Sequence, residues 1–229
     1  MPTSNAISFD NVTVRFGGRS VLRNLNIKLD QRRIGVIGLN ASGKSTFARL
    51  LNGLVTATEG RVSVHEIDPS KNPMAARREV GFIFSNPDMQ IIMPTVQEDV
   101  AFSLRGSGLE KAEIDAKVRA ALIRFGLLAV AEEPAHSLSG GQKQLLAICA
   151  IWVANPGLIV ADEPTALLDA ANTKQIANLL LDELDQQLVL VTHDMNLAAR
   201  CDVLLHFEDG RLEQMGEPDK VIDRYLASV

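Results

Sequence analysis

The sequence is poor in cysteine and has no excess of basic side chains. Its two cysteines, Cys149 and Cys201, sit in apolar surroundings, and neither has a Cys or His partner at metal-ligand spacing. We therefore expect two reduced, buried thiols. The 23 basic and 28 acidic side chains give a formal net charge of −5. The chain thus lacks the positive charge that general nucleic-acid binding requires.

Long hydrophobic runs are also missing. The longest, residues 145–154, is far shorter than the roughly 20 apolar residues that span a bilayer. Residues 1–10 are polar and contain no apolar stretch of the kind found in a secretory signal. We expect no transmembrane segment, so any role at a membrane requires a partner chain.

The hydrophobic pattern that is present predicts an α/β fold. Residues 7–16 and 21–29 alternate apolar and polar side chains on either side of Gly17 and Gly18, which predicts a β-hairpin. Short buried strands separated by helical segments are expected at residues 34–38, 61–64, 80–84, 158–161, 188–192 and 203–207. This alternation favours a mostly parallel sheet.

The middle of the chain has a different character. Residues 110–128 and 139–153 show helical periodicity without intervening strand patterns. We therefore predict a helical insertion over residues 87–156, within an α/β core formed by residues 1–86 and 157–229.

A glycine-rich segment follows the predicted strand at residues 34–38. It reads Gly38-Leu39-Asn40-Ala41-Ser42-Gly43-Lys44-Ser45-Thr46 and leads into a predicted helix, as a phosphate-binding P-loop does. Glycines let backbone N–H groups turn inward around phosphate oxygens, and the helix directs its positive end at the same anion. Lys44 is expected to reach the β- and γ-phosphates of ATP, and the Ser45 hydroxyl to bind Mg²⁺. The alternative is a glycine-rich turn that merely precedes a helix.

Two adjacent carboxylates end the strand predicted at residues 158–161. Asp162 and Glu163 come where open α/β sheets bind ligands, at the carboxyl end of a strand. We expect Asp162 to hold the hydration shell of Mg²⁺ and Glu163 to polarise the attacking water as general base. A strand followed by a polar cap is the alternative.

A third segment, Leu138-Ser139-Gly140-Gly141-Gln142, opens the helix predicted at residues 139–153. A helix that starts with Ser-Gly-Gly can form a second anion site. The alternative is that the serine is only an N-cap followed by a flexible glycine pair. The segment resembles the signature sequence of ABC (ATP-binding cassette) ATPases, and the resemblance covers nearly the whole chain. It implies a P-loop, RecA-like core with an N-terminal antiparallel β portion and a helical signature subdomain.

The resemblance assigns further residues. Phe16 stands where the family stacks an aromatic ring on adenine, with a strand-end core residue as the alternative. Ser139, Gly140, Gly141 and Gln142 would grip the γ-phosphate of the ATP held by a facing subunit. Asp169 would lie in the D-loop, which crosses the dimer interface. His193 matches the switch histidine, which contacts the γ-phosphate and orients the catalytic water.

Three positions depart from the family pattern. Leu145 in the signature helix and Leu167 in the D-loop are expected to adjust packing without abolishing hydrolysis. Ser85 stands where the family has a glutamine, in the Q-loop, that touches Mg²⁺ and senses the membrane partner. The serine side chain is shorter, which puts the Mg²⁺ role of this position in doubt. Gln90 lies five residues later in the sequence and cannot be assumed to substitute.

Residues 84–90 and 95–100 are similar to the energy-coupling-factor (ECF) importer ATPases, which carry an Asn-Pro-Asp-x-Gln segment here. The likeness, with the short C-terminus, implies an ATP-hydrolysing subunit at the cytoplasmic face of the membrane that energises import of biotin or a transition-metal ion. Its partners would be a second cassette, identical or different, a transmembrane coupling subunit and a substrate-binding membrane subunit, without nucleic acid. The alternative is a soluble ABC ATPase that acts on DNA or ribosomes.

Overall fold

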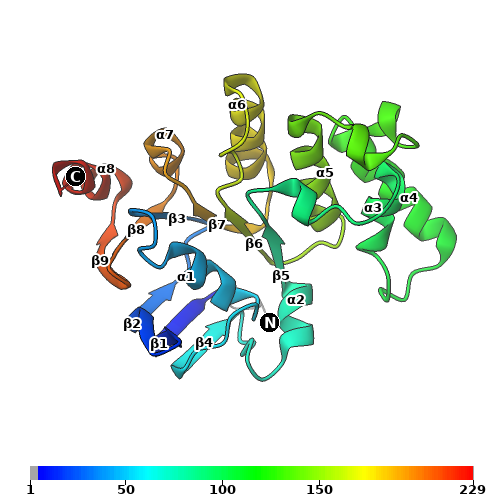
Figure 1. Cartoon of the computed structure of the whole chain (residues 1–229). Helices are drawn as coiled ribbons and strands as arrows, with labels where there is room; N and C mark the ends of the chain where they lie inside the picture. Colours follow the sequence, from blue (N-terminus) through cyan, green and yellow to red (C-terminus); the bar gives the residue numbers. More distant parts are fainter. Residues whose placement is uncertain (1–4, 229) are drawn as a thin grey trace. The chain divides into compact units, whose positions relative to one another are not determined.

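The computed structural model describes residues 5–228 (Figure 1). Part of the polar segment predicted at the start of the chain, residues 1–4, lies outside the described residues. The structure divides into two compact units. One comprises the described residues up to Phe82, Gly157–Glu163 and the chain from Leu180 onward; the other comprises Ile83–Pro156 and Pro164–Leu179.

The first unit contains two sheets. The antiparallel sheet has the order β2-β1-β4, formed by β1 (Ile7–Phe16), β2 (Arg19–Leu29) and β4 (Glu59–Val64). The larger sheet has the order β5-β6-β7-β3-β8-β9, with strands β3 (Arg33–Ile37), β5 (Val80–Ile83), β6 (Leu158–Asp162), β7 (Gln187–Val191), β8 (Val203–Glu208) and β9 (Arg211–Gly216).

Pairing within the larger sheet confirms the predicted fold class. Strands β6 and β7, β7 and β3, and β3 and β8 pair in parallel, whereas β9 returns antiparallel to β8. The hairpin predicted around Gly17 and Gly18 joins β1 to β2. A mostly parallel sheet beside an N-terminal antiparallel one is the arrangement that the sequence predicts.

Helix α1 (Lys44–Leu51) contacts strands of both sheets, so it connects the two halves of the core. Its Phe47 ring lies 4.9 Å from the ring of Phe9 in β1 and 5.2 Å from that of Phe207 in β8. All three side chains are buried. Because burying an aromatic side chain contributes about 2–3 kcal/mol, this cluster anchors the helix, and with it the loop that precedes the helix.

The remaining helices of the first unit are α2 (Pro73–Glu79), α7 (Met195–Ala198) and α8 (Pro218–Ser228). A π-helical turn, Leu179–Glu183, precedes β7. No helix within residues 5–228 combines the length and the hydrophobicity needed to cross a membrane.

The second unit is helical. It contains α3 (Val96–Phe102), α4 (Lys111–Arg124), α5 (Gly140–Trp152) and α6 (Ala170–Asn178), with single 3₁₀ turns at Pro87–Met89 (η1), Leu128–Val130 (η2) and Ala135–Ser137 (η3). Helix α5 contacts α3, α4 and α6, so it forms the centre of the unit. Residues 164–179 belong to this unit, although they fall within the part of the chain that is predicted as core.

Candidate functional site

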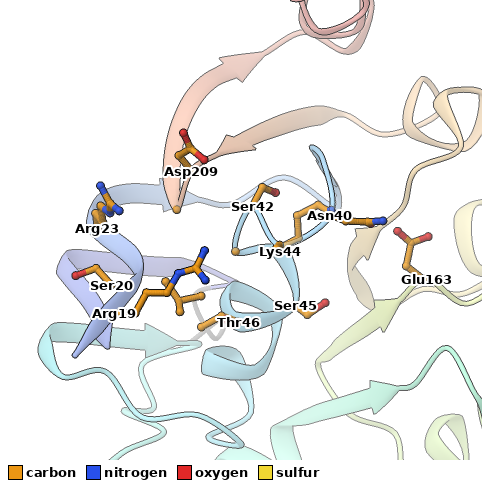
Figure 2. Close-up of a pocket in the computed structure, with 14 residues that line it drawn as sticks. Arg19, Ser20, Arg23, Asn40, Ser42, Lys44, Ser45, Thr46, Glu163 and Asp209 are labelled. Atoms are coloured by element: carbon orange, nitrogen blue, oxygen red, sulfur yellow. The ribbon is translucent and has the colours of Figure 1, made fainter. Parts of the chain in front are cut away.

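A pocket of about 380 Å³ opens in the first unit around the start of α1 (Figure 2). Residues 40–46 form one wall, and the start of β2 forms another. Glu163 and the turn between β8 and β9 complete the lining. Segments from distant parts of the sequence therefore meet around the glycine-rich loop.

Two glycines of this loop have a conformation and a packing that exclude side chains. Gly38 has φ 142°, and a Cβ atom there would collide with the carbonyl oxygen of Phe207. Gly43 has φ 107°, and its Cβ would lie 2.9 Å from the carbonyl oxygen of Val21. The loop backbone is thereby pressed between β8 and β2, which fixes the direction of its N–H groups.

Lys44 is buried within the loop that it closes. Its Nζ donates hydrogen bonds to the carbonyl oxygens of Gly38 at 2.8 Å and Leu39 at 2.9 Å. Burial lowers the pKa of Lys44, and the nearby carboxylates of Glu163 and Asp162 oppose that shift. The Ser42 hydroxyl is also buried and has no hydrogen-bond partner among the described residues. A phosphate oxygen would supply the acceptor that this hydroxyl lacks, so the loop fits the predicted anion.

Ser45 and Asp162 lie together, as the predicted Mg²⁺ site requires. Ser45 Oγ donates a hydrogen bond of 3.1 Å to Asp162 Oδ1. Burial raises the pKa of the Asp162 carboxyl, and the Ser45 hydrogen bond opposes that shift. A hydroxyl and a carboxylate are hard oxygen donors, which suit Mg²⁺. Residues 5–228 contain no group of three or more His, Cys, Asp or Glu placed to hold a metal, and Ser45 and Asp162 are the residues that would hold Mg²⁺.

Glu163 and His193 form a pair at the ends of two neighbouring strands. Glu163 has φ 55°, a left-handed conformation that costs a non-glycine residue about 1–2 kcal/mol. Its backbone N–H donates to the carbonyl oxygen of Val191 at 3.0 Å, which holds this turn in place. His193 Nδ1 lies 2.7 Å from Glu163 Oε2, a contact that is an ion pair when the imidazole is protonated. The geometry joins a candidate base to an orienting group.

Ser139 is the N-cap of α5 and forms a reciprocal capping box with Gln142. Ser139 Oγ accepts from the Gln142 N–H at 3.3 Å, and Gln142 Oε1 accepts from the Ser139 N–H at 3.0 Å. The N-cap alternative therefore holds, and it leaves the N–H groups of Gly140 and Gly141 without helical partners. A Cβ at Gly140 would meet nothing within 4 Å. An anion role for this helix start stays a prediction.

Asp169 caps α6 in the same unit. Its Oδ1 accepts from the Asn172 N–H at 2.8 Å, and its Oδ2 accepts from the Asn172 side-chain amide at 2.9 Å. These hydrogen bonds, led by the one from the Asn172 backbone, lower the pKa of Asp169. A Cβ at Gly141 would collide with the same Asn172 side chain. Asn172 thus connects the predicted D-loop residue to the predicted signature segment.

The segment around Ser85 is held by other side chains. Ser85 is exposed. Gln90 Oε1 accepts from the Phe84 N–H at 3.3 Å, and Gln90 Nε2 donates to the carbonyl oxygen of Ala147 in α5 at 3.2 Å. Asp88 forms an ion pair of 2.7 Å with Lys143, one turn earlier in α5. The Gln90 amide therefore links this segment to the signature helix. Its oxygen accepts a hydrogen bond from the segment, and its nitrogen donates one to the helix.

A family model described as ABC transporter matches residues 22–166. The chain belongs to the ABC transporter family. Biotin transport ATP-binding protein BioM of Rhizobium etli is 43% identical over 219 residues, covering 96% of this chain and 97% of that protein. Energy-coupling factor transporter ATP-binding protein EcfA1 of Ligilactobacillus salivarius is 34% identical over 224 residues, covering 95% of this chain and 79% of that protein.

Solved structures of this family have the same fold. The structure of cbiO1 from Clostridium perfringens, part of the ABC transporter complex cbiONQ, has a TM-score of 0.86 at 28% identity and covers 97% of this chain and 92% of its own. A dimeric post-hydrolysis structure of the ATP-binding cassette MJ0796, bound to ADP and Pi, has a TM-score of 0.79 at 29% identity and covers 93% and 98%. This chain is therefore an ABC ATPase, which binds and hydrolyses ATP.

Phe16 is paired across the hairpin with a residue that lines the ABC ATPase pocket. It ends β1 and is 52% exposed, which excludes the alternative that it is a core residue. Its cross-strand partner, Arg19, lines the pocket. Arg19, Arg23 and Asp209 also line the pocket, and the sequence patterns do not predict them there. The two-residue turn at Gly17 and Gly18 places Arg19 opposite Phe16, whereas its place in the pocket depends on how β2 packs against the P-loop.

Proposed function

We propose that this ABC ATPase energises a membrane importer of the energy-coupling-factor type. The observation that carries the catalytic part is the pair of Glu163 and His193, with 2.7 Å between Oε2 and Nδ1. Both the pocket with Lys44 and the hydrogen-bonded Ser45 and Asp162 belong to the same compact unit as this pair. A phosphate cradle, hard oxygen donors and a base with its orienting group are what ATP hydrolysis requires.

The residues take separate roles in this proposal. Residues 38–46 bind the phosphates, and Ser45 and Asp162 would hold Mg²⁺, which when bound neutralises charge on the β- and γ-phosphate oxygens. Glu163 accepts a proton from the attacking water. His193 Nδ1–H fixes the direction of the Glu163 carboxylate, and the other ring nitrogen is left to face the γ-phosphate. Phe16 is the proposed adenine platform.

A second cassette would complete each ATP site. The N–H groups of Gly140 and Gly141 at the start of α5 have no helical partners, and Asp169 is joined to this segment through Asn172. A relative of the same fold is a dimer bound to ADP and Pi. We therefore place the helix start of one cassette on the γ-phosphate held by the other. The two cassettes are identical or different chains.

The names of the relatives support the proposed membrane partners. One is named for biotin transport, one for energy-coupling factor transporters, and the cbiO1 structure belongs to a transporter complex. We propose that this chain sits at the cytoplasmic face of a membrane, bound to a transmembrane coupling subunit and a substrate-binding membrane subunit. Biotin, cobalt and nickel are the candidate cargoes.

Uptake in the native cell tests this proposal. Cells that produce only the Glu163→Gln variant should lose uptake of one labelled cargo among biotin, Co²⁺ and Ni²⁺, while wild-type cells keep it. The tagged protein, purified in mild detergent, should bring membrane subunits with it. Undiminished uptake of all three cargoes, together with co-purifying ribosomes or DNA, would refute the importer assignment in favour of the soluble class.

A further inference from the structure

Arg19 occupies a distinctive place at the mouth of the nucleotide pocket. It is the first residue of β2 and pairs directly with Phe16, the last residue of β1. Directly opposed residues of an antiparallel pair project to the same face of the sheet. Arg19 lines the pocket, and in Figure 2 its guanidinium points into the pocket toward the helix that carries Thr46.

The Arg19 guanidinium is unpaired within the described part of the chain. Among residues 5–228 it forms no ion pair and no side-chain hydrogen bond. Arg15 on the same hairpin behaves differently, because its guanidinium pairs with Glu59 at 2.6 Å and donates to Ser20 at 3.4 Å. Of these two arginines of the hairpin, only the one that faces the pocket keeps its charge available.

The pocket also has a direction. Glu163 marks the end where the γ-phosphate reacts, and Lys44, which serves the β- and γ-phosphates, lies near that carboxylate. Arg19 lies on the β2 wall, on the side away from Glu163 (Figure 2). A triphosphate laid along residues 40–46 with its γ end at Glu163 therefore brings its α-phosphate toward Arg19.

We propose that Arg19 is a nucleotide-binding residue that places its guanidinium on the α-phosphate of bound ATP. The inference rests on the proposed ATP site and adds a contact to it. A guanidinium matches the oxygens of a phosphate with two parallel N–H donors, which makes the contact both strong and directional. Arg19 supplies positive charge to the part of the triphosphate that Lys44 does not serve.

The loss of this contact should have the same effect on the affinity for several nucleotides, because they all carry an α-phosphate. ATP, ADP, GTP and GDP all carry it, so the loss of Arg19 weakens each of them by a similar factor. Arg19 does not touch the reacting atoms, so its loss raises KM and leaves kcat nearly unchanged. Loss of a residue that contacts the base would instead change the affinity for adenine nucleotides and guanine nucleotides by different factors.

Calorimetric titration of the full chain tests the contact, with Arg19→Ala, Arg19→Lys and the control Arg15→Ala. We expect Arg19→Ala to raise Kd about tenfold for Mg-ADP and Mg-GDP alike, about 1.4 kcal/mol each. Arg19→Lys should raise Kd about threefold, because it keeps the charge and loses the two parallel N–H donors, and Arg15→Ala should match wild type. Steady-state turnover of Arg19→Ala should show the higher KM with kcat within about twofold.

Unchanged Kd values in Arg19→Ala would overturn the inference, and so would a loss confined to adenine nucleotides. Thermal unfolding of each variant shows whether it is folded, and Arg19→Lys keeps the test decisive if the alanine variant is not. A wild-type chain that binds none of these nucleotides would refute the proposed function itself. If wild type binds these nucleotides and Arg19→Ala binds them equally well, only the role of Arg19 is refuted.

Discussion

His193 Nδ1 lies 2.7 Å from Glu163 Oε2, and a second contact, from the His193 backbone N–H to the same oxygen at 3.4 Å, spans the same 30 residues of sequence. The two residues meet because β6 and β7 are adjacent and parallel, so the residues that follow them emerge at one edge of the sheet. The left-handed turn at Glu163 persists because the Val191 carbonyl accepts its N–H. Local strain is therefore held by the strand pairing at the place where the proposed chemistry occurs.

Composite sites make a prediction about mixtures of inactive chains. Lys44→Ala removes the side-chain ammonium that binds the ATP phosphates, and Ser139→Arg places a bulky side chain at the start of α5. Each variant alone should therefore have little ATPase activity. A mixed dimer has one site with both lesions and one site with none. Mixing should therefore restore a measurable phosphate-release rate if a single intact site suffices. The control is each variant mixed with itself at the same total concentration, and activity equal to that control would argue against shared sites.

Ser85 makes a prediction about coupling. Because Ser85 is exposed and a bridging water can replace a direct contact, Ser85→Gln should change nucleotide affinity by less than about tenfold, or ~1.4 kcal/mol. The effect on stimulation by the membrane subunit should be larger, since coupling depends on how two states differ. ATPase rates of wild type and variant, alone and in the assembled transporter at saturating Mg-ATP, provide the measurement. Equal rates in both settings would make Ser85 neutral and leave coupling to the segment that follows it.

That segment makes a prediction about stability. Gln90→Ala removes the acceptor of the Phe84 N–H and the donor to the Ala147 carbonyl, so it should lower the free energy of unfolding by about 1–2 kcal/mol. Ser85→Ala, next to this network and exposed, should stay within about 0.5 kcal/mol of wild type. Urea unfolding followed by circular dichroism compares the two variants. Equal midpoints would show that Gln90 does not hold the segment to α5.

The two cysteines make a prediction about reactivity. Burial raises the pKa of Cys149 to about 12 and, likewise, that of Cys201 to about 12. The thiolate is the reactive form, so at pH 8 a disulfide reagent such as DTNB should label neither thiol of the native chain within minutes. Both thiols should react in denaturing guanidinium, which serves as the control. Rapid labelling of the native protein would mean that one of these side chains is accessible.

Sequence reasoning works here where the chemistry is concentrated in consecutive residues. Residues 38–46 and the pair of Asp162 and Glu163 each follow a buried strand directly, so strand prediction alone places them at the edge of the sheet. Ser139 was recognised for a similar reason, because a serine followed by two glycines and a glutamine is itself a helix start. The predicted strands agree with the observed ones within a few residues, because each buried strand is a short run of consecutive apolar residues.

The elements that were missed have weaker signals. Strand β9 is an edge strand whose residues alternate between exposed and half-buried, so its apolar face is too sparse to detect. Helix α2 is only seven residues long, and its one clear mark is Asn72 before Pro73. Arg19 was missed because pocket membership depends on packing: β2 meets the P-loop and the β8–β9 turn through close contacts of Gly43 and Gly210. No local pattern records such contacts.

The most direct test of the account is phosphate release from Mg-ATP by the purified Glu163→Gln variant. Lys44, Ser45 and Asp162 are intact in this variant, so ATP affinity should equal that of wild type, while turnover should fall by roughly 10²–10⁴-fold because the base is gone. Glu213→Gln, at an exposed carboxylate of β9 outside the pocket, should turn over like wild type. Turnover of Glu163→Gln close to the wild-type rate, with ATP bound normally, would contradict the assignment of Glu163 as the base.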